Sequence, residues 1–367
     1  MRREIWRHFD FWLMGAVALL IIIGVAMIQS SIAGNIELIE NNTTGRHIIF
    51  ALIGFGVIIL TTYLDYHVWI AISRILYALL FILFFFILFF GEALFGAQRS
   101  LDLGFLIIQP SELAKLAIIV LLADFFQKYQ GRVGDLSVVA RSGLITATLV
   151  ILIILQPDLS TSIVLIVIWF ALLWAAGLEV KHLAIFVLGA VFVSLAALPF
   201  LADYQQQRII NFVFPDPNAT FGENYNVNQA LITVGSGGWL GQGYGQGSQV
   251  QLRFLKVRWS DFIFSSIANE LGFVGSLVIM ALLFFVIWRC LRAARLAPDT
   301  TGALIAYGVA TWIGFQAMVN IGMNLNLLPV TGLPLPFVSQ GGSALLSLML
   351  AIGIVQSIVA RQRTIES

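Results

Sequence analysis

The longest polar interval of the chain begins with Leu201-Ala-Asp-Tyr-Gln-Gln-Gln-Arg208 and ends with Trp259-Ser260-Asp261-Phe262. Apolar blocks make up most of the sequence on both sides of it. Of the 367 residues, 59% are hydrophobic and 11% are charged, whereas about a quarter of the residues of a soluble globular protein are charged. The sequence therefore predicts a polytopic membrane protein with one large polar segment between its spans.

Charge, cysteine content and missing motifs exclude several classes of protein. A net charge of +1 provides no basic stripe, so no nucleic-acid partner is expected. The single cysteine, Cys290, excludes an internal disulfide and a thiolate metal cluster. The sequence has no Gly-rich loop ending in Lys-Ser/Thr, no His pair at metal-ligand spacing and no Gly-x-Ser-x-Gly elbow. ATP-driven chemistry, a transition-metal site and serine hydrolysis are therefore not expected.

The apolar blocks are about as long as helices that cross a bilayer. The first block follows Arg2, Arg3 and Arg7 as a secretory signal would, but it is longer than a signal core and is expected to be retained. The predicted spans are Phe11–Ile28, 48–64, 72–91, 113–127, 142–155, 159–176, 183–200, 262–288, 302–323 and 343–360. We expect an all-α polytopic membrane protein of about ten transmembrane helices. It forms one domain over 1–367, with a large extracytoplasmic loop at 201–261.

The Lys and Arg residues predict the orientation of the spans, because they accumulate in cytoplasmic loops. Most of them fall on one side if the N-terminus is cytoplasmic, which also places the C-terminus inside and 201–261 outside. The cations that then face outward are Arg46, Arg99, Lys115, Arg208, Arg253, Lys256 and Arg258. Because the orientation rule does not require these cations, they are candidates for binding an anion.

The composition of the polar interval favours a ligand that carries sugars and phosphate. Its residues include many amides, aromatics and glycines, as in Asn224-Tyr225-Asn-Val-Asn228-Gln229 and Gly241-Gln-Gly-Tyr-Gly-Gln-Gly247. Amides pair with hydroxyl groups, and glycine lets backbone N–H groups approach phosphate closely. Asp261 lies where the interval enters an apolar helix, so we expect its carboxylate to be partly desolvated and its pKa to be perturbed.

A short polar stretch, Gln109-Pro110-Ser111-Glu112-Leu-Ala-Lys115, lies on the same outer side. Ser111 is the expected helix cap after Pro110, with Glu112 in the favourable first turn. Glu112 and Lys115 are three residues apart, so they share a helix face and can form an ion pair. From spacing alone, a self-neutralising pair and a functional pair are equally good interpretations.

Two further interruptions fall on the outer side. In the turn Gln156-Pro157-Asp158-Leu159, the carboxylate is either a plain helix cap or part of a site, and spacing slightly favours the cap. The stretch Pro329–Ser343 holds three Pro and three Gly and cannot form a continuous helix. Irregular backbone near membrane depth is tolerated only where protein buries it or where it lines a cavity, so this stretch should line a cavity.

Polar residues also occur inside the predicted spans. Asn320 and Asn324 are interpreted as residues that join helices, the commoner role for amides in a membrane. Glu270 lies deep in the eighth span and needs a partner or a watery cavity, which the sequence does not identify.

These motifs, in this order, resemble those of the SEDS proteins (shape, elongation, division and sporulation) along essentially the full length, most closely the members that act in cell elongation. The residues that carry the resemblance are Arg99, Gln109-Pro-Ser-Glu112-Leu-Ala-Lys115, Gln156-Pro-Asp158-Leu, Arg208, Asn211-Phe212, Gln229, Gly235-Ser-Gly-Gly238, Asp261-Phe-Ile-Phe, Glu270-Leu-Gly, Asn320-Ile-Gly-Met and Pro329–Ser343.

The resemblance implies a peptidoglycan glycosyltransferase of the bacterial cytoplasmic membrane. Such an enzyme polymerises lipid II into nascent glycan, surrounded by membrane lipids and beside a class B penicillin-binding protein that cross-links the product. Asp261 matches the essential aspartate of the family. The substrate-binding residues implied by the resemblance and by the outward charges are Arg208, Arg99, Lys115, Glu112, Asp158, Gln229 and Ser339.

The groups available define an expected mechanism. An α-linked sugar diphosphate that gives a β-1,4 product requires inversion, for which one general base suffices. Asp261 is the best candidate for that base. Arg208, Arg99 and Lys115 would stabilise the departing diphosphate. A divalent cation such as Mg²⁺ or Mn²⁺ could share that work, with Asp158 or Glu112 as oxygen ligands, although the sequence shows no dedicated metal site.

Two other functions fit part of the sequence. A lipid II flippase would explain the many spans, Glu270 and the broken backbone at Pro329–Ser343. It would also need alternating access, usually marked by matching half-repeats, which we do not find. A scaffold that only recruits the penicillin-binding protein would explain the spans but not Asp261.

Overall fold

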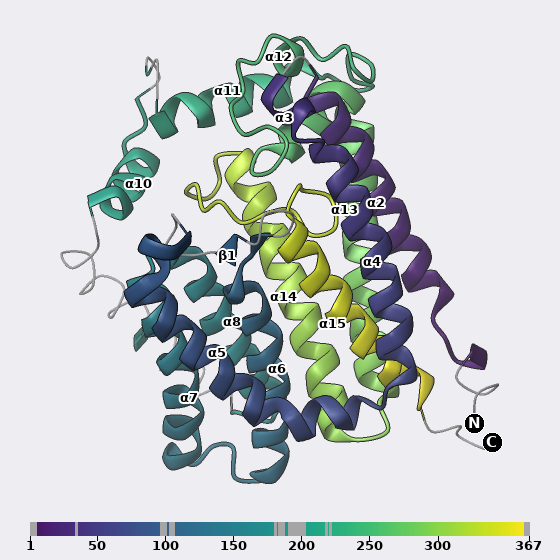
Figure 1. Cartoon of the computed structure of the whole chain (residues 1–367), viewed down its shortest axis with the longest axis vertical. Coiled ribbons are helices and arrows are strands. Elements are labelled where there is room, and N and C mark those ends of the chain that lie inside the picture. The colour runs from purple at the N-terminus through teal and green to yellow at the C-terminus, as the bar shows by residue number, and fades with distance from the viewer. Residues whose placement is uncertain are drawn as a thin grey trace.

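The computed structural model describes residues 6–33, 36–95, 101–102, 107–179, 182, 188–189, 203–216, 219 and 222–362. This part of the chain is almost entirely helical, as expected (Figure 1). The helices are α2 (Phe11–Ser31), α3 (Ile36–Glu40), α4 (Thr43–Tyr63), α5 (Tyr66–Phe95), α6 (Pro110–Lys128), α7 (Leu136–Leu155), α8 (Leu159–Ala175), α10 (Asp203–Val213), α11 (Gly222–Ser236), α12 (Ser248–Gln251), α13 (Ile263–Leu296), α14 (Thr300–Asn324) and α15 (Gly342–Ala360). Two strands of two residues each, β1 (Leu101–Asp102) and β2 (Ile107–Ile108), pair antiparallel before α6.

Within the described residues, seven helices are long and apolar enough to cross a membrane. They are α2, α4 with the end of α3, α5, α7, α13, α14 and α15. The apolar α8 is shorter, and α6 carries four charged residues but is buried along most of its length. Each predicted span therefore coincides with a helix, except the span at 183–200, which lies almost entirely outside the described residues.

Helices α14 and α15 lie in the middle of the bundle (Figure 1). Helix α15 packs against α4, and α14 packs against α6 and α8 on one side and α13 on the other. Close approach of α15 to α4 depends on Gly353, where a Cβ atom would lie 1.8 Å from Thr61 Oγ1. Small residues commonly allow such contacts between membrane helices. This packing holds the first turns of α6 and α8 close to the turn that precedes α13.

The prediction that the polar interval 201–261 is one large loop is wrong. The interval contains α10, α11 and α12, which lie beyond the end of the bundle (Figure 1). Ile209 and Phe212 recur at helical spacing among the polar residues of α10, and this periodicity stabilises an amphipathic helix. The glutamine and asparagine content concealed this pattern.

Helix α13 contains a break at Gly272, which has φ 70° and ψ −166°. The Gly-rich segment 237–247 provides hydrogen-bond partners on both sides of the break. Backbone N–H groups of Gln242 and Gly243 donate to the carbonyl groups of Asn269 and Glu270. A Cβ atom at Gly272 would lie 2.2 Å from Gly241 N, so no larger residue fits. The loop and the helix therefore form one structural unit.

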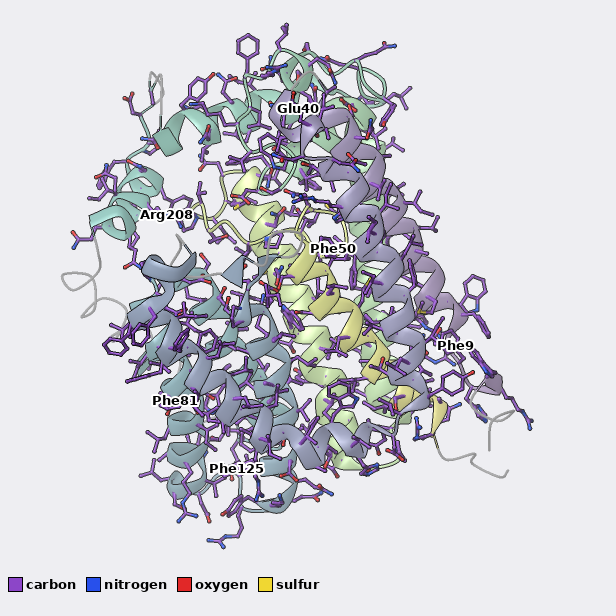
Figure 2. All side chains as sticks on the ribbon, in the orientation of Figure 1. Phe9, Glu40, Phe50, Phe81, Phe125 and Arg208 are labelled. Carbon is purple, nitrogen blue, oxygen red and sulfur yellow. The ribbon has the colours of Figure 1, made fainter. Side chains whose placement is uncertain are left out.

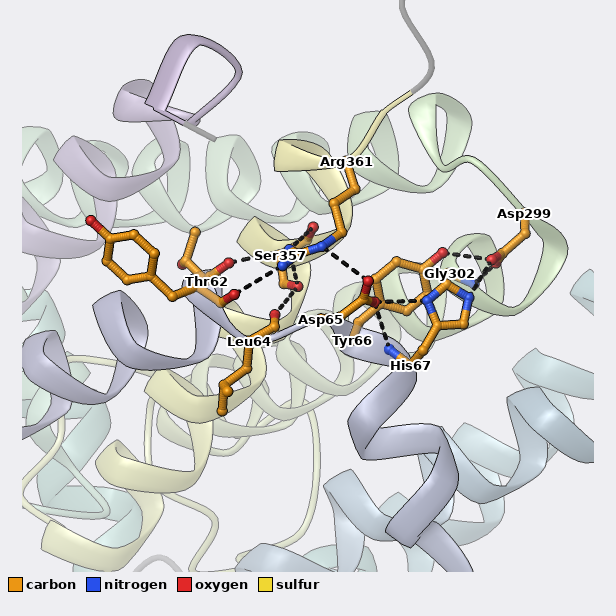
Figure 3. Close-up of polar contacts among 10 residues, drawn as sticks. Thr62, Leu64, Asp65, Tyr66, His67, Asp299, Gly302, Ser357 and Arg361 are labelled. Carbon is orange, nitrogen blue, oxygen red and sulfur yellow. Dashed lines mark hydrogen bonds and ion pairs between the residues drawn. The ribbon is translucent and has the colours of Figure 1, made fainter. Parts of the chain in front are cut away.

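At the opposite end of the bundle, a polar cluster joins the α4–α5 turn to the start of α14 and the end of α15 (Figure 3). Asp299 accepts hydrogen bonds from the hydroxyl group of Tyr66 (2.5 Å) and the backbone N–H of Gly302 (2.7 Å). Arg361 Nε lies 3.3 Å from Asp65 Oδ2. Burial alone would raise the pKa of the Asp65 carboxyl group, but hydrogen bonds from His67 and the Arg361 charge outweigh burial and lower this pKa. The cluster holds together the ends of three segments that are distant in sequence.

Candidate active site

Asp261 lies on the turn that precedes α13, and two amides of α14 hold its backbone. Nδ2 of Asn320 and Nδ2 of Asn324 donate to the Asp261 carbonyl oxygen at 3.1 and 3.0 Å. Asn324 Oδ1 also accepts from the N–H and hydroxyl groups of Ser265 at 3.1 and 2.7 Å. The two asparagines lie one turn apart and share a helix face. They join helices, as predicted, and they also fix the position of Asp261.

The side chain of Asp261 is only partly exposed and has one hydrogen bond among the described residues. The Ser260 hydroxyl group donates to its Oδ1 at 3.0 Å. Burial raises the pKa of the Asp261 carboxyl group above its usual value, and this effect outweighs the opposite effects of Ser260 and the Arg208 charge. A desolvated carboxylate of raised pKa is suited to accept a proton near neutral pH. The perturbation predicted from its position in the sequence is confirmed.

Asp261 lines a cavity of about 480 Å³. The irregular stretch from Pro329 to Pro334 forms one wall, as expected for broken backbone at this depth. Gly332 adopts a φ of 72° there, and a Cβ atom would lie 3.7 Å from Asp261 Oδ2. The other walls come from the first turns of α6 and α8 and from α10. Residues from five separate parts of the sequence therefore face one space.

Arg208 reaches this cavity from α10 and is labelled in Figure 2. It also lines a smaller adjacent groove with Asn211, Asn224 and Asn228. Its positive charge partly offsets the effect of burial, which raises the pKa of Asp261. The cavity thus combines a cation and a carboxylate with amide groups close by.

Glu112 and Lys115 form the predicted ion pair, with Lys115 Nζ 2.8 Å from Glu112 Oε1. The Lys115 ammonium group also donates to Gln316 Oε1 at 3.2 Å and lies 5.1 Å from the centre of the Trp312 ring. Lys115 is fully buried behind Glu112, and only Glu112 lines the cavity. The second carboxylate oxygen of Glu112 is buried and has no hydrogen-bond partner. Glu112 therefore offers one unoccupied acceptor, while substrate contact by Lys115 stays a prediction.

Asp158 is the cap of α8, so the simpler of the two predictions for it is confirmed. Its side chain accepts from the Thr161 N–H and hydroxyl groups at 3.1 and 2.9 Å. It also accepts from Gln109 Nε2 at 3.3 Å and the Ser111 hydroxyl group at 3.4 Å. Asp158 lines the cavity as well.

The predicted Ser111 cap of α6 is wrong, because Gln109 occupies the cap position and Pro110 starts the helix.

Three other predicted site residues have different positions. The Ser339 hydroxyl group donates to the Ser260 carbonyl oxygen at 2.7 Å and accepts from Leu335 N–H at 2.8 Å, so Ser339 ties the irregular stretch to the turn of Asp261. Gln229 lies on α11 and does not line the cavity in the described part of the chain. Arg99 lies outside the described residues. Substrate binding by these residues stays a prediction.

The partner of Glu270, which the sequence did not reveal, is Ser30 at the end of α2. The Ser30 hydroxyl group donates to Glu270 Oε1 at 2.5 Å, and Gly245 N–H donates to Oε2 at 3.1 Å. Gln251 Nε2 lies 3.4 Å from Oε1. No sequence signal links residues 240 positions apart. Glu270 therefore fixes the Gly-rich segment to α2 and α13 and does not face the cavity of Asp261.

No group of three or more His, Cys, Asp or Glu side chains among the described residues could enclose a metal ion. Glu112 and Asp158 nevertheless both line the cavity and provide carboxylate oxygens of the type that Mg²⁺ and Mn²⁺ prefer. Because Mg²⁺ usually keeps several waters and binds through one or two carboxylates, these two residues fit such an ion.

The fold and the cavity define a class: a polytopic membrane enzyme whose carboxylate of raised pKa shares a cavity with an arginine. A model of the FtsW, RodA and SpoVE family, described as cell cycle proteins, matches residues 11–364. The chain therefore belongs to this family, the SEDS proteins, and it is a peptidoglycan glycosyltransferase.

Individual relatives agree with this family. The peptidoglycan glycosyltransferase MrdB of Escherichia coli K12 is 39% identical over 275 residues, which cover 73% of this chain and 72% of MrdB. The probable peptidoglycan glycosyltransferase FtsW of Geobacter metallireducens is 34% identical over 374 aligned positions, covering 98% of this chain and 97% of FtsW.

Two solved structures share the fold. The RodA protein of Thermus thermophilus is 27% identical with a TM-score of 0.69, and the alignment covers 96% of both chains. A chain from a study of a peptidoglycan synthase complex, on the coordination of polymerization and crosslinking, is 27% identical with a TM-score of 0.79. That alignment covers 96% of this chain and 97% of the other.

Proposed function

We propose that this glycosyltransferase polymerises lipid II by inverting transfer at the outer face of the cytoplasmic membrane, with Asp261 as the general base. The observation that carries the proposal is the cavity shared by Asp261 and Arg208. One residue can accept a proton there, and the other can bind a phosphate group. Both belong to the polar interval that we assign to the extracytoplasmic side, where Lys and Arg are not required by topology.

The reaction joins the 4-hydroxyl group of one sugar to C1 of another. The hydroxyl oxygen attacks C1 from the face opposite the diphosphate, the C1–O bond to the diphosphate breaks, and the hydroxyl proton passes to Asp261. A positioned base typically contributes about 10²–10⁴-fold to such a step. The raised pKa of Asp261 improves the match between the base and neutral pH. The amides of Asn320 and Asn324 hold the backbone of the base in place before the substrate arrives.

The departing diphosphate needs positive charge, and Arg208 is the described cation that lines the cavity. Its planar guanidinium group can bind two phosphate oxygens at once, and preorganised charge of this kind is often the largest catalytic contribution. Glu112 and Asp158 would hold a divalent cation, Mg²⁺ or Mn²⁺, at the same wall, and the cation would neutralise further phosphate charge when bound.

We assign the enzyme to cell elongation and cell shape, beside a class B penicillin-binding protein. Similarity to MrdB and RodA supports elongation, while similarity to FtsW over nearly the full length supports the common family chemistry. The fold match to a chain from a peptidoglycan synthase complex supports a cross-linking partner. The Lys and Arg distribution supports cytoplasmic termini at both ends.

The test uses the purified protein with its penicillin-binding partner and labelled lipid II in detergent, scored for glycan polymer on a gel. In parallel, the protein in vesicles is scored for translocation of lipid II across the bilayer. We expect polymer from the wild-type protein and none from Asp261→Asn. Translocation without polymer would instead support the flippase interpretation, and neither activity would support a scaffold.

A further inference from the structure

A second cavity, of about 300 Å³, lies at the end of α13 far from Asp261. It is formed by the residues that lead into α2, the last turns of α13 and the end of α15. Figure 2 labels Phe9, which lines it. The part of α13 that follows the break at Gly272 runs from Phe273 to Leu296, and at about 1.5 Å per residue it spans roughly 36 Å, more than the thickness of the hydrocarbon core. The second cavity therefore lies at the opposite membrane face from the candidate active site.

The charge of this cavity is positive. Three arginines line it, Arg7, Arg289 and Arg292, against one carboxylate, Asp10. Asp10 is already occupied, because Arg289 Nε and Nη2 lie 2.6 and 2.5 Å from its Oδ2. Arg7 and Arg292 are exposed, and neither has an acidic partner within the described part of the chain. Two guanidinium groups thus remain available at the mouth of the cavity.

The surroundings of the cavity match the boundary between lipid headgroups and acyl chains. Trp12 and Trp288 are 73% and 45% exposed beside the arginines, and tryptophan is enriched at this boundary in membrane proteins. Further from the cavity along the same helices, Ile22 of α2 and Phe284 of α13 are 62% and 70% exposed. These two helices pack against each other. A molecule with a negatively charged head at the arginines could therefore lay its apolar chains against α2 and α13.

We propose that this cavity binds the phosphate group of an anionic phospholipid from the adjacent membrane leaflet, through Arg7 and Arg292. The Asp10–Arg289 ion pair keeps α2 and α13 at the spacing that places the two free arginines on one side of the cavity. Basic pockets between helices at a membrane surface are suited to such headgroups, and each arginine near the surface is worth about 1 kcal/mol, or about fivefold in affinity. This site is independent of the proposed chemistry at Asp261.

The test measures binding of fluorescent phosphatidylglycerol to the purified full-length protein in an uncharged detergent. Phosphatidylcholine and inorganic phosphate serve as competitors. We expect the variant with both Arg7→Gln and Arg292→Gln to bind about 25-fold more weakly. The control with the same change of charge carries Arg132→Gln, between α6 and α7, and Arg141→Gln, on α7; neither residue lines the cavity. This control should bind like the wild type.

The outcomes separate the sources of binding. Equal loss in the control variant would show unspecific attraction to positive charge and would overturn the proposal, as would unchanged binding in the Arg7 and Arg292 variant. Displacement by millimolar inorganic phosphate would show a site for small anions instead of a lipid. Displacement by phosphatidylcholine would show that the headgroup charge is not recognised. These competition results on the wild-type protein decide the proposal even if the double variant does not fold.

Discussion

Replacement of Asp261 by Asn removes the proposed base with little change in shape. The turn should survive, because Asn320 and Asn324 bind the backbone carbonyl group of residue 261 and not its side chain. The side-chain oxygen of Asn can still accept from the Ser260 hydroxyl group. Burial raises the pKa of Asp261, so the folded state disfavours its charge, and the neutral amide should cost no stability at neutral pH. The variant therefore isolates proton transfer from folding.

The expected loss is about 10²-fold or more in the rate of polymerisation, or roughly 3 kcal/mol of barrier. The assay counts glycan polymer formed from labelled lipid II by the complex with the penicillin-binding protein. The pH profile gives a second measure. The base acts only when ionised, so the wild-type rate should fall as the pH decreases through a pKa above that of an ordinary aspartate. The residual rate of Asp261→Asn should lack this decline.

A matched control is Asp135→Asn, the cap residue of α7, which is exposed and pairs with Arg132 away from the cavity. It should polymerise at the wild-type rate. Thermal unfolding and co-purification with the partner are measured for both variants. A stable Asp261→Asn protein with wild-type turnover would refute the assignment of the general base. A variant that unfolds or loses its partner would point to a structural role for the carboxylate.

Further predictions concern the phosphate, the positioning of the base and the topology. Arg208→Ala should be nearly inactive and Arg208→Lys partly active, because lysine keeps the charge but loses the two-pronged contact; normal turnover by the alanine variant would remove Arg208 from the site. Asn324→Leu leaves buried polar groups without a partner and should lower stability by about 1–3 kcal/mol. Loss of one of the two amides that hold the Asp261 carbonyl group should displace the base and lower kcat. Because Asn320 still binds this carbonyl group, KM and the pH profile should stay unchanged, and a shifted pH profile would contradict a positioning role. Cysteines at Gln207 and Asp135 should be labelled from outside and inside the cell respectively, and labelling of Gln207 only from inside would invert the proposed orientation.

Local patterns in the sequence predicted much of this fold. Hydropathy and length located the spans that the structure describes, and the three-residue spacing of Glu112 and Lys115 predicted their ion pair. The Pro and Gly content of Pro329–Ser343 predicted a cavity wall. Each of these features depends on residues that are neighbours along the chain or around one helix, so one sequence contains the necessary information.

Features that depend on tertiary contacts were not accessible from the sequence. The hydrogen bond between Ser30 and Glu270 joins α2 to α13, and the amide clamp on Asp261 joins α14 to the turn before α13. Burial of Lys115 behind Glu112 depends on how α6 packs against α14. The helices of the polar interval were missed because their high glutamine and asparagine content was interpreted as that of a loop.

The break in α13 at Gly272 has a consequence for how the protein is assembled in the membrane. The carbonyl groups of Asn269 and Glu270 receive hydrogen bonds from Gln242 and Gly243, residues of the polar interval. Unpaired carbonyl groups are costly in a bilayer, so the first part of α13 cannot reach its final form until the preceding segment has docked on it. In the orientation that we propose, translocation of the polar interval must therefore precede completion of α13. A chimera that exchanges the interval must keep a close fit between its backbone and residue 272, because a Cβ atom at Gly272 would lie 2.2 Å from Gly241 N.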